Sequence, residues 1–361
     1  MSETPEQHFP SDYRAARAAF VAAAEGAGFG VTSRVHAKAR GADGKPLFMD
    51  VAAAGARTAK RALLLISGTH GVEGYFGSGV QTGLLRQGLA GRVPKGARLV
   101  LLHALNPFGF SWNRRVNEHN ADINRNFVDH AHPPANEAYD KLADAIAPRA
   151  ISRAAMKKAD AQLTEFAATR GPFALQEAIS RGQYQHPDGL YFGGTAESWS
   201  AAMLKDVFRE ELHDVEELVV LDFHTGLGEH GATELITEDL PGSPGYRRAK
   251  KMWGELVRSS ESGESVSAPL MGTLDQAAGL WMKGQALTFA ALEVGTQSLR
   301  DVFDALRKDN WLHAHSSLEY RHAKAIKKAI REAFYPDTAE WKRKVWTSAD
   351  RVVTSALAAL S

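Results

Sequence analysis

The sequence predicts an α/β protein: a single domain with a mixed, largely parallel central sheet and helices on both faces. Four short, mostly apolar runs bounded by turn residues favour this fold, because strands buried on both faces of a parallel sheet have this pattern. They are RALLLIS at 61–67, RLVLLHAL at 98–105, ELVVLDF at 217–223 and ALTFAALEV at 286–294. Helical segments lie between them, and strands that alternate with helices indicate a sheet covered on both sides.

The other regular elements are predicted from the same periodicities. Residues 11–28 carry Ala, Phe and Val at helical spacing, and two shorter strand-like pieces follow at 31–37 and 47–53. Further helices are predicted over residues 74–88, 298–333 and 338–360.

Two segments depart from this alternation. Residues 106–132 form a long polar loop rich in Asn and Arg, and loops of that length inside a compact domain usually serve function. Residues 133–215 are mostly helical, with a break around 182–194. Because they lie between two predicted strands, we expect them to be an insertion within one domain that spans 1–361.

Composition excludes several classes of protein. The chain has 361 residues, of which 44% are hydrophobic and 24% charged, as in globular proteins with a sizeable core. A net charge of +1 gives no electrostatic case for nucleic acid or an anionic membrane as partner. The chain has no cysteine, which excludes disulfides and thiolate metal sites. No secretory pattern and no run of about 18 apolar residues is present, so we expect a cytoplasmic protein.

A metal site is predicted from the motif His70-Gly71-Val72-Glu73. Imidazole nitrogen and carboxylate oxygen both bind zinc, and a catalytic site has three protein ligands and an open position. His70 follows a buried strand and precedes a helix. A second H-x-x-E, from His213 to Glu216, lies in a charged segment before a strand, where a solvated surface is expected.

The third ligand is predicted at His224, in LDFHTG, which also follows a buried strand. Ligands bind at the carboxyl ends of parallel strands, so residues at two such ends can converge on one ion. Asp222 lies two residues before His224 and therefore points to the same side of the strand. We expect its carboxylate to orient an imidazole.

The polar loop holds a cluster of cationic and amide side chains. Arg114, Arg115, Asn124 and Arg125 lie in WNRRVNEHNADINRNF. Because a guanidinium pairs a carboxylate through two hydrogen bonds, the cluster indicates a site for an anionic substrate or an oxyanion. A solvated basic loop is the alternative, and the interleaved apolar residues disfavour it.

Glu293 ends the predicted strand ALTFAAL-Glu. A charged residue at the end of a buried strand costs free energy unless it has a partner or a task. A carboxylate beside zinc can take a proton from a bound water and pass it to a leaving nitrogen.

Taken in order, GTHGVE, DINRNF, LDFHTG and LEVGTQ resemble the zinc metallocarboxypeptidase clan. The resemblance is closest to its aspartoacylase and succinylglutamate desuccinylase branch and to a related, uncharacterised carboxypeptidase-like family. It covers about residues 60–130 and 217–297. It implies one Zn²⁺ per chain, held by His70, Glu73 and His224.

The resemblance also implies roles for the remaining motif residues. Asn124 and Arg125 match the pair that holds the substrate carboxylate, and Glu293 matches the general base. An upstream arginine would polarise the scissile carbonyl: Arg115 is the choice, with Arg114 as the alternative. For the substrate-covering tyrosine of the family, Tyr246 is a candidate only.

The predicted function is therefore zinc-dependent hydrolysis of an amide bond next to a free carboxylate. The substrate would be a small molecule or a peptide, so a carboxypeptidase and an N-acyl amino acid deacylase are both open. HGVE, DFHTG and EVGTQ favour the small-substrate branch, whereas NRNF is equally peptidase-like. The rival from another class is a non-catalytic zinc-containing protein that binds an anion.

Overall fold

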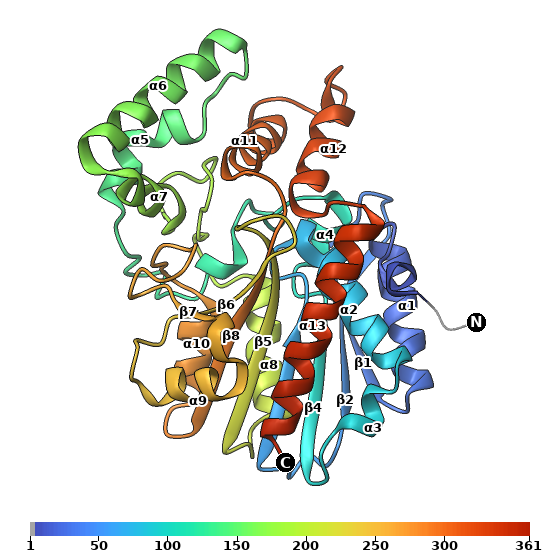
Figure 1. Ribbon diagram of the computed structural model, residues 1–361. Coiled ribbons are helices and arrows are strands. Elements are labelled where there is room, and N and C mark those ends of the chain that lie inside the picture. Colours follow the sequence, from blue (N-terminus) through green and yellow to red (C-terminus); the bar gives the residue numbers. More distant parts are fainter. Residues whose placement is uncertain (1–3) are drawn as a thin grey trace.

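A computed structural model describes residues 4–361, which contain an eight-stranded sheet in the order β1-β2-β4-β3-β5-β8-β6-β7 (Figure 1). The strands are β1 (Gly30–Arg40), β2 (Pro46–Ala54), β3 (Arg61–Ile66), β4 (Ala97–His103), β5 (Glu217–Gly226), β6 (Thr233–Thr237), β7 (Val257–Ser259) and β8 (Ala286–Gly295). The central strands β4, β3, β5 and β8 are parallel, while β2 and β6 run antiparallel to their inner neighbours. The prediction of a mixed, largely parallel sheet is confirmed.

Helices cover both faces of this sheet, as predicted. One face packs against α1 (Tyr13–Gly26), α2 (Gly74–Arg86) and α13 (Ala339–Ala359), and the other against α8 (Trp199–Glu211) and α10 (Leu274–Trp281). Within β3, Leu63 and Leu65 belong to the first apolar cluster, and Leu64 and Ile66 belong to the second. This division explains why the strand has a continuous apolar run instead of an alternating one.

A third group of helices lies beyond the carboxyl ends of the strands, at the top of Figure 1. It consists of α5 (Glu137–Ile146), α6 (Arg153–Arg170), α7 (Pro172–Ser180), α11 (Leu299–His315) and α12 (Ala323–Phe334). These helices share an apolar cluster of their own. The helical segment predicted at 133–215 thus divides between two places, because α5 to α7 join this group whereas α8 packs on the sheet.

Four elements lie in residues 227–285, where no element was predicted. They are β6, β7, α9 (Pro244–Trp253) and α10. Strands β6 and β7 have only five and three residues, TELIT and VRS, too few to display a period. The expected long loop at 106–132 also contains a short helix, α4 (Pro107–Trp112), and a 3-10 turn at Ile123–Arg125.

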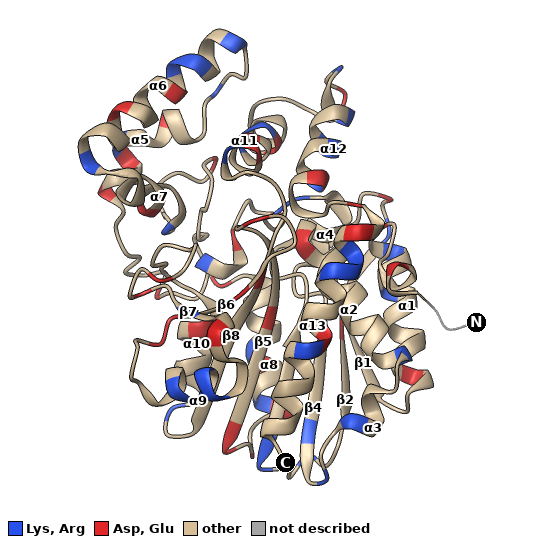
Figure 2. Ribbon diagram, viewed as in Figure 1, with Lys and Arg blue, Asp and Glu red and all other residues tan. Residues whose placement is uncertain are grey.

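Charge and apolarity are distributed as in a globular protein. Basic and acidic residues are interspersed over the helices in the view of Figure 2, as expected from the net charge of +1. Among the described residues, no helix is both long and apolar enough to cross a membrane.

Candidate functional site

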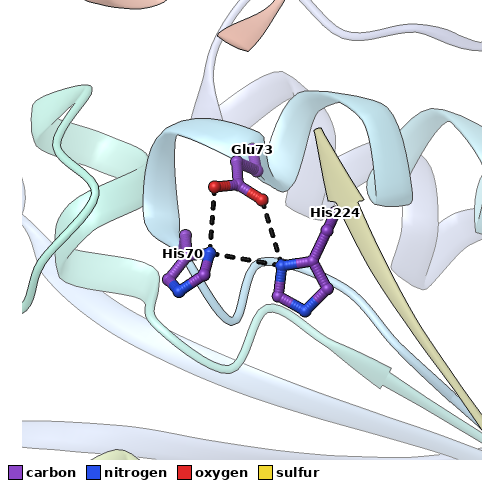
Figure 3. Close-up of side chains that lie close together, drawn as sticks. All are labelled: His70, Glu73 and His224. Carbon is purple, nitrogen blue, oxygen red and sulfur yellow. Dashed lines mark hydrogen bonds and ion pairs between the residues drawn. The ribbon is translucent and has the colours of Figure 1, made fainter. Parts of the chain in front are cut away.

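The three predicted metal ligands meet at the carboxyl ends of β3 and β5 (Figure 3). His70 and Glu73 lie just after β3, with Glu73 in the 3-10 turn Gly71–Glu73 that leads into α2, and His224 lies on β5. Their convergence follows from the sheet, because β3 and β5 are parallel neighbours. Gly71 is required locally: a Cβ there would lie 2.0 Å from the backbone carbon of Gly109.

The donor atoms of these three buried side chains face one another. His70 Nδ1 lies 2.9 Å from Glu73 Oε1, and His224 Nδ1 lies 3.1 Å from Glu73 Oε2. The two Nδ1 atoms are 3.2 Å apart. Two imidazole nitrogens and one carboxylate oxygen form a donor set that suits zinc and leaves a position for a further ligand. The site can therefore hold a metal ion.

His224 is oriented from behind by a carboxylate. Its Nε2 lies 2.7 Å from Asp222 Oδ2, and Thr69 donates a hydrogen bond of 2.7 Å to the other oxygen of Asp222. When the proton is on Nε2, Nδ1 is unprotonated and its lone pair is free to bind a metal. The contact with Asp222 therefore selects the tautomer that metal binding requires. The role expected for Asp222 from its place on the strand agrees with this geometry.

His70 has a comparable carboxylate, Asp122. The distance from His70 Nε2 to Asp122 Oδ1 is 3.1 Å. Arg115 Nη2 lies 2.8 Å from the same ring nitrogen, so Nε2 either donates to Asp122 or accepts from Arg115. Metal binding through Nδ1 requires the first arrangement. Asp122 was not singled out in the sequence, where its position within DINRNF resembles that of a helix cap.

Electrostatics favour the charged forms of Glu73 and His224. Burial raises the pKa of Glu73, but the charge of His70 and the hydrogen bond from His224 outweigh burial, so the pKa lies below its ordinary value. Burial lowers the pKa of His224, but Asp222 and Glu73 outweigh it and raise the pKa well above the usual range. A cation at this place would take over the role of the imidazole protons.

All seven predicted site residues line one cavity of about 700 Å³. They are His70, Glu73, Arg115, Asn124, Arg125, His224 and Glu293. Volumes of this order are typical of sites for small organic ligands.

Glu293 lies beside the metal ligands on β8. It is paired in register with His224 and is 7% exposed. Its Oε1 accepts a hydrogen bond of 2.9 Å from the backbone N–H of Leu227. No cationic side chain within residues 4–361 forms an ion pair with it. Burial and the negative charge of Glu73 raise the pKa of Glu293 to about 8.

The structure distinguishes the two candidate arginines. Arg115 lies in the cavity, with Nη1 3.1 Å from Glu73 Oε1 and Nε 2.9 Å from Asp122 Oδ2. Arg114 does not line this cavity, and its Nε lies 3.3 Å from Asp309. Burial lowers the pKa of Arg115, but Asp122 and Glu73 outweigh burial and raise it. Arg115 is thus a held cation directed at the site.

The Asn124–Arg125 pair lies on the 3-10 turn at the cavity wall. Arg125 is 2% exposed, and its guanidinium donates only to backbone carbonyls, those of Ser180 and Asn124. Among the described residues, no carboxylate lies within ion-pair distance of Arg125. Burial lowers the pKa of Arg125. A buried guanidinium without an anionic partner is costly, so its position favours an anionic ligand.

A tyrosine that the sequence analysis did not select also lines the cavity. The ring of Tyr191 lies 5.3 Å from the guanidinium carbon of Arg115 and 5.7 Å from that of Arg125. Its φ of 53° is in the left-handed region, which is rare for a bulky residue. Tyr246, the earlier candidate, lies outside the cavity on α9 and donates to Glu264 at 3.1 Å. No pattern in the sequence predicts the left-handed backbone conformation of Tyr191.

Two carboxylates at another part of the cavity wall were missed as well. Glu238 follows β6, and Asp275 lies in the first turn of α10. The backbone N–H of Glu238 donates to Asp275 Oδ2 at 3.1 Å. Burial raises the pKa of Glu238, and burial together with the charge of Glu238 raises the pKa of Asp275 well above its usual range.

Comparison with solved structures identifies the class of fold. Bovine thrombin-activatable fibrinolysis inhibitor, solved in complex with tick carboxypeptidase inhibitor, matches with a TM-score of 0.52 and 10% identity over 98% of both chains. A metallo-carboxypeptidase from Pseudomonas aeruginosa matches with a TM-score of 0.44 and 15% identity, over 96% of this chain and 71% of that one. The succinylglutamate desuccinylase from Chromobacterium violaceum matches with a TM-score of 0.40 and 15% identity, over 91% of this chain and 73% of that one.

The fold assignment rests on the first of these structures, and it confirms the resemblance to the metallocarboxypeptidase clan at the level of the fold. The chain itself belongs to the family described as "Protein of unknown function (DUF2817)", whose model matches residues 9–348. The comparison with curated proteins found no match.

The first prediction concerns metal content. The purified protein should bind about one zinc per chain, and His70→Ala and His224→Ala should each lose it, because three protein ligands are the minimum of a catalytic site. Metal is measured by elemental analysis after dialysis. His213→Ala is the matched control, since this exposed histidine of the second H-x-x-E lies on the surface. Unchanged zinc in both ligand variants would show that the site is elsewhere.

The second prediction concerns pH and the Glu238–Asp275 pair. A carboxyl whose pKa is raised in the folded state favours folding while it is protonated, so its contribution is lost as the pH rises above the unfolded pKa of Asp. Asp275→Asn should therefore be more stable than the wild type at pH 8, and the difference should shrink towards pH 4. Denaturant unfolding across this range measures it, with the exposed Asp144→Asn as control. A difference that grows towards low pH would contradict the assignment.

Proposed function

We propose that this protein is a zinc-dependent hydrolase that cleaves an amide bond next to a free carboxylate. The observation that carries the proposal is that one cavity is lined by a His-Glu-His donor set, by an unpaired buried carboxylate and by an unpaired buried guanidinium. Each supplies a different requirement of the reaction: a metal, a proton carrier and an anchor for the substrate.

His70, Glu73 and His224 would hold the zinc ion. Asp222 and Asp122 would orient the two imidazoles so that both Nδ1 atoms face the ion. Bound zinc supplies Lewis-acid chemistry, which lowers the pKa of a water molecule and polarises a carbonyl group.

Glu293 would move the protons. One of its oxygens is held by the N–H of Leu227, and the other is free to face the reacting atoms. A pKa in the neutral range suits a group that accepts a proton from the attacking water and then delivers it to the leaving nitrogen. A metal cation beside it would lower that pKa and favour the carboxylate form that accepts the first proton.

Two arginines would divide the negative charge of the substrate between them. Arg115, fixed by Asp122 and Glu73, would stabilise the oxyanion that develops on the scissile carbonyl. Arg125, with the amide of Asn124, would bind the substrate carboxylate, which would become the partner that this guanidinium lacks.

A peptide and an N-acyl amino acid both offer an amide next to a terminal carboxylate, so a carboxypeptidase and a deacylase are both consistent with this geometry. Glu293 weighs against the rival, a non-catalytic zinc-containing protein that binds an anion, because anion binding gives no use for a buried, unpaired carboxylate. The cytoplasm stays the predicted location.

The third prediction tests the carboxylate anchor. Arg125→Ala should lower kcat/KM at least about 30-fold, because losing a charged hydrogen-bonded partner of a buried anion costs about 2–5 kcal/mol. The loss in kcat/KM should be far larger for substrates with a free terminal carboxylate than for the same substrates with that carboxylate converted to an amide. Arg181→Ala serves as control. This half-exposed arginine directly follows Ser180, the residue at the end of α7 to which Arg125 donates. Equal losses on acids and amides would remove Asn124 and Arg125 from this role.

The fourth prediction separates catalysis from binding. Glu293→Gln keeps the shape of the side chain and removes the base, so the variant should fold, retain zinc and bind substrate while turnover falls by at least about 100-fold. Zinc content, melting temperature and turnover are measured on one preparation. Glu234→Gln is a matched control, because Glu234 is paired with Glu293 in register on β6 but bonds to Ser265. Near-normal turnover with a lowered melting temperature would make Glu293 a structural residue.

A further inference from the structure

One wall of the cavity has no task in the proposed chemistry. Helices α6, α7 and α11 form it, and its lining side chains are mainly apolar. They include Leu163, Phe173, Ile179, Val302, Phe303 and Leu306. We call this the apolar wall. The metal ligands and the carboxylate anchor do not need it, so it is available to another part of the substrate.

Two further observations show that the apolar wall is open to a ligand. Phe173, on α7, is 48% exposed, and Leu299, at the start of α11, is 56% exposed, yet both line the cavity. Large apolar side chains that face water inside a concave site are typical of ligand-binding surfaces.

Charged residues beside the apolar wall are already paired with one another. Asp160 lies 2.7 Å from both Arg300 and Arg307, and Asp304 lies 3.3 Å from Arg307. The neighbouring hydroxyl of Thr164 donates to a backbone carbonyl of its own helix. Because these carboxylates and guanidinium groups are paired with one another, an apolar group suits this wall better than a charged one.

The apolar wall is continuous with the metal ligands. Val302, Leu306 and Phe334 belong to the same apolar cluster as Val72, which lies between the two ligands His70 and Glu73 in the chain. The wall and the three candidate ligands also line the same cavity, so a group bonded to a carbonyl at the metal site could extend onto this wall.

The carboxylate anchor lies between α7 and α10, because the guanidinium of Arg125 donates to Ser180 O at the end of α7. The side-chain oxygen of Asn124 accepts a hydrogen bond of 2.8 Å from the N–H of Leu274, at the start of α10. This contact ties the anchor to the part of the cavity formed by α10, Glu238 and Asp275. With its carboxylate at this anchor, between α7 and α10, and its scissile carbonyl at the metal ligands, a substrate would direct its acyl portion to the α11 part of the wall.

We propose that the apolar wall binds the acyl group of the substrate, and that the substrate is an amino acid whose nitrogen carries an aliphatic or aromatic acyl group of several carbons. This inference rests on the proposed function and narrows it to one substrate class. In the reaction the C–N bond breaks, and water adds its hydroxyl to the acyl carbon and its proton to nitrogen. The products are a carboxylic acid and a free amino acid.

Binding of an acyl series to zinc-loaded Glu293→Gln tests the proposal without requiring turnover. The probes are N-acetyl-, N-hexanoyl- and N-decanoyl-alanine, titrated by calorimetry. The Kd should fall with chain length by up to about 4-fold for each methylene that the wall buries. In the wild type, kcat/KM should rise in the same order.

The double substitution Phe173→Ser with Leu299→Ser, made in Glu293→Gln, tests the location. Both side chains are exposed, so the protein should fold, while the dependence of Kd on chain length should weaken. Leu280→Ser is the matched control, because this residue is 74% exposed and lies outside the cavity. It should keep the full dependence.

The outcomes separate this inference from the proposed function. Equal affinity along the series, or a chain-length dependence that the double substitution leaves intact, would overturn the acyl site. Chain-length-dependent binding without turnover in the wild type would support the acyl site and contradict the hydrolase. Turnover that ignores chain length would support the hydrolase and contradict the acyl site.

Discussion

Parallel pairing of β3 with β5, and of β5 with β8, determines where the chemistry of this protein lies. The register places Ile66, the last residue of β3, opposite Asp222, while β5 and β8 run on together past His224 and Glu293, which face each other, to Gly226 and Gly295. Side chains at or just beyond these ends then share one space, although His70 and His224 are 154 residues apart in the chain. Everything else in the site is built outward from this edge: the arginine loop, the 3-10 turn of Asn124 and the helices above them.

Charged groups of the site are paired on the side that faces the protein and unpaired on the side that faces the cavity. Towards the protein, every charged group has a partner: Asp222 for His224, Asp122 for His70, and Glu73 for Arg115. Towards the cavity, Glu293 and Arg125 lack an ion-pair partner within the described part of the chain. Burying an unpaired polar or charged group costs free energy, so these two groups lower the stability of the fold at the place where the proposed metal ion and substrate would bind.

The sequence predicted the central sheet and the metal ligands because both depend on short-range pattern. A buried parallel strand is a continuous apolar run, and a ligand at its carboxyl end follows that run directly, as His70 and His224 do. The flanking strands β6 and β7 were missed because five and three residues are too few for a period. Arg114 and Arg115 could not be separated in the sequence, because adjacent residues differ only in the direction of their side chains. Tyr191 and the pair of Glu238 and Asp275 reach the cavity through long-range packing, which no local pattern encodes.

Gly71 lies where the turn of His70 and Glu73 contacts the loop of Arg114 and Arg115. Since Gly71 has no side chain, the backbone of Gly109 can approach it closely. The turn that carries the candidate metal ligands therefore packs on the arginine loop. There Gly71 N–H donates to Arg115 O at 3.1 Å, and Val72 N–H donates to Arg114 O at 2.8 Å. The turn and the loop therefore form a single mechanical unit. Substitutions at this contact would therefore alter the candidate metal site and the proposed oxyanion site together, through residues that lie in neither.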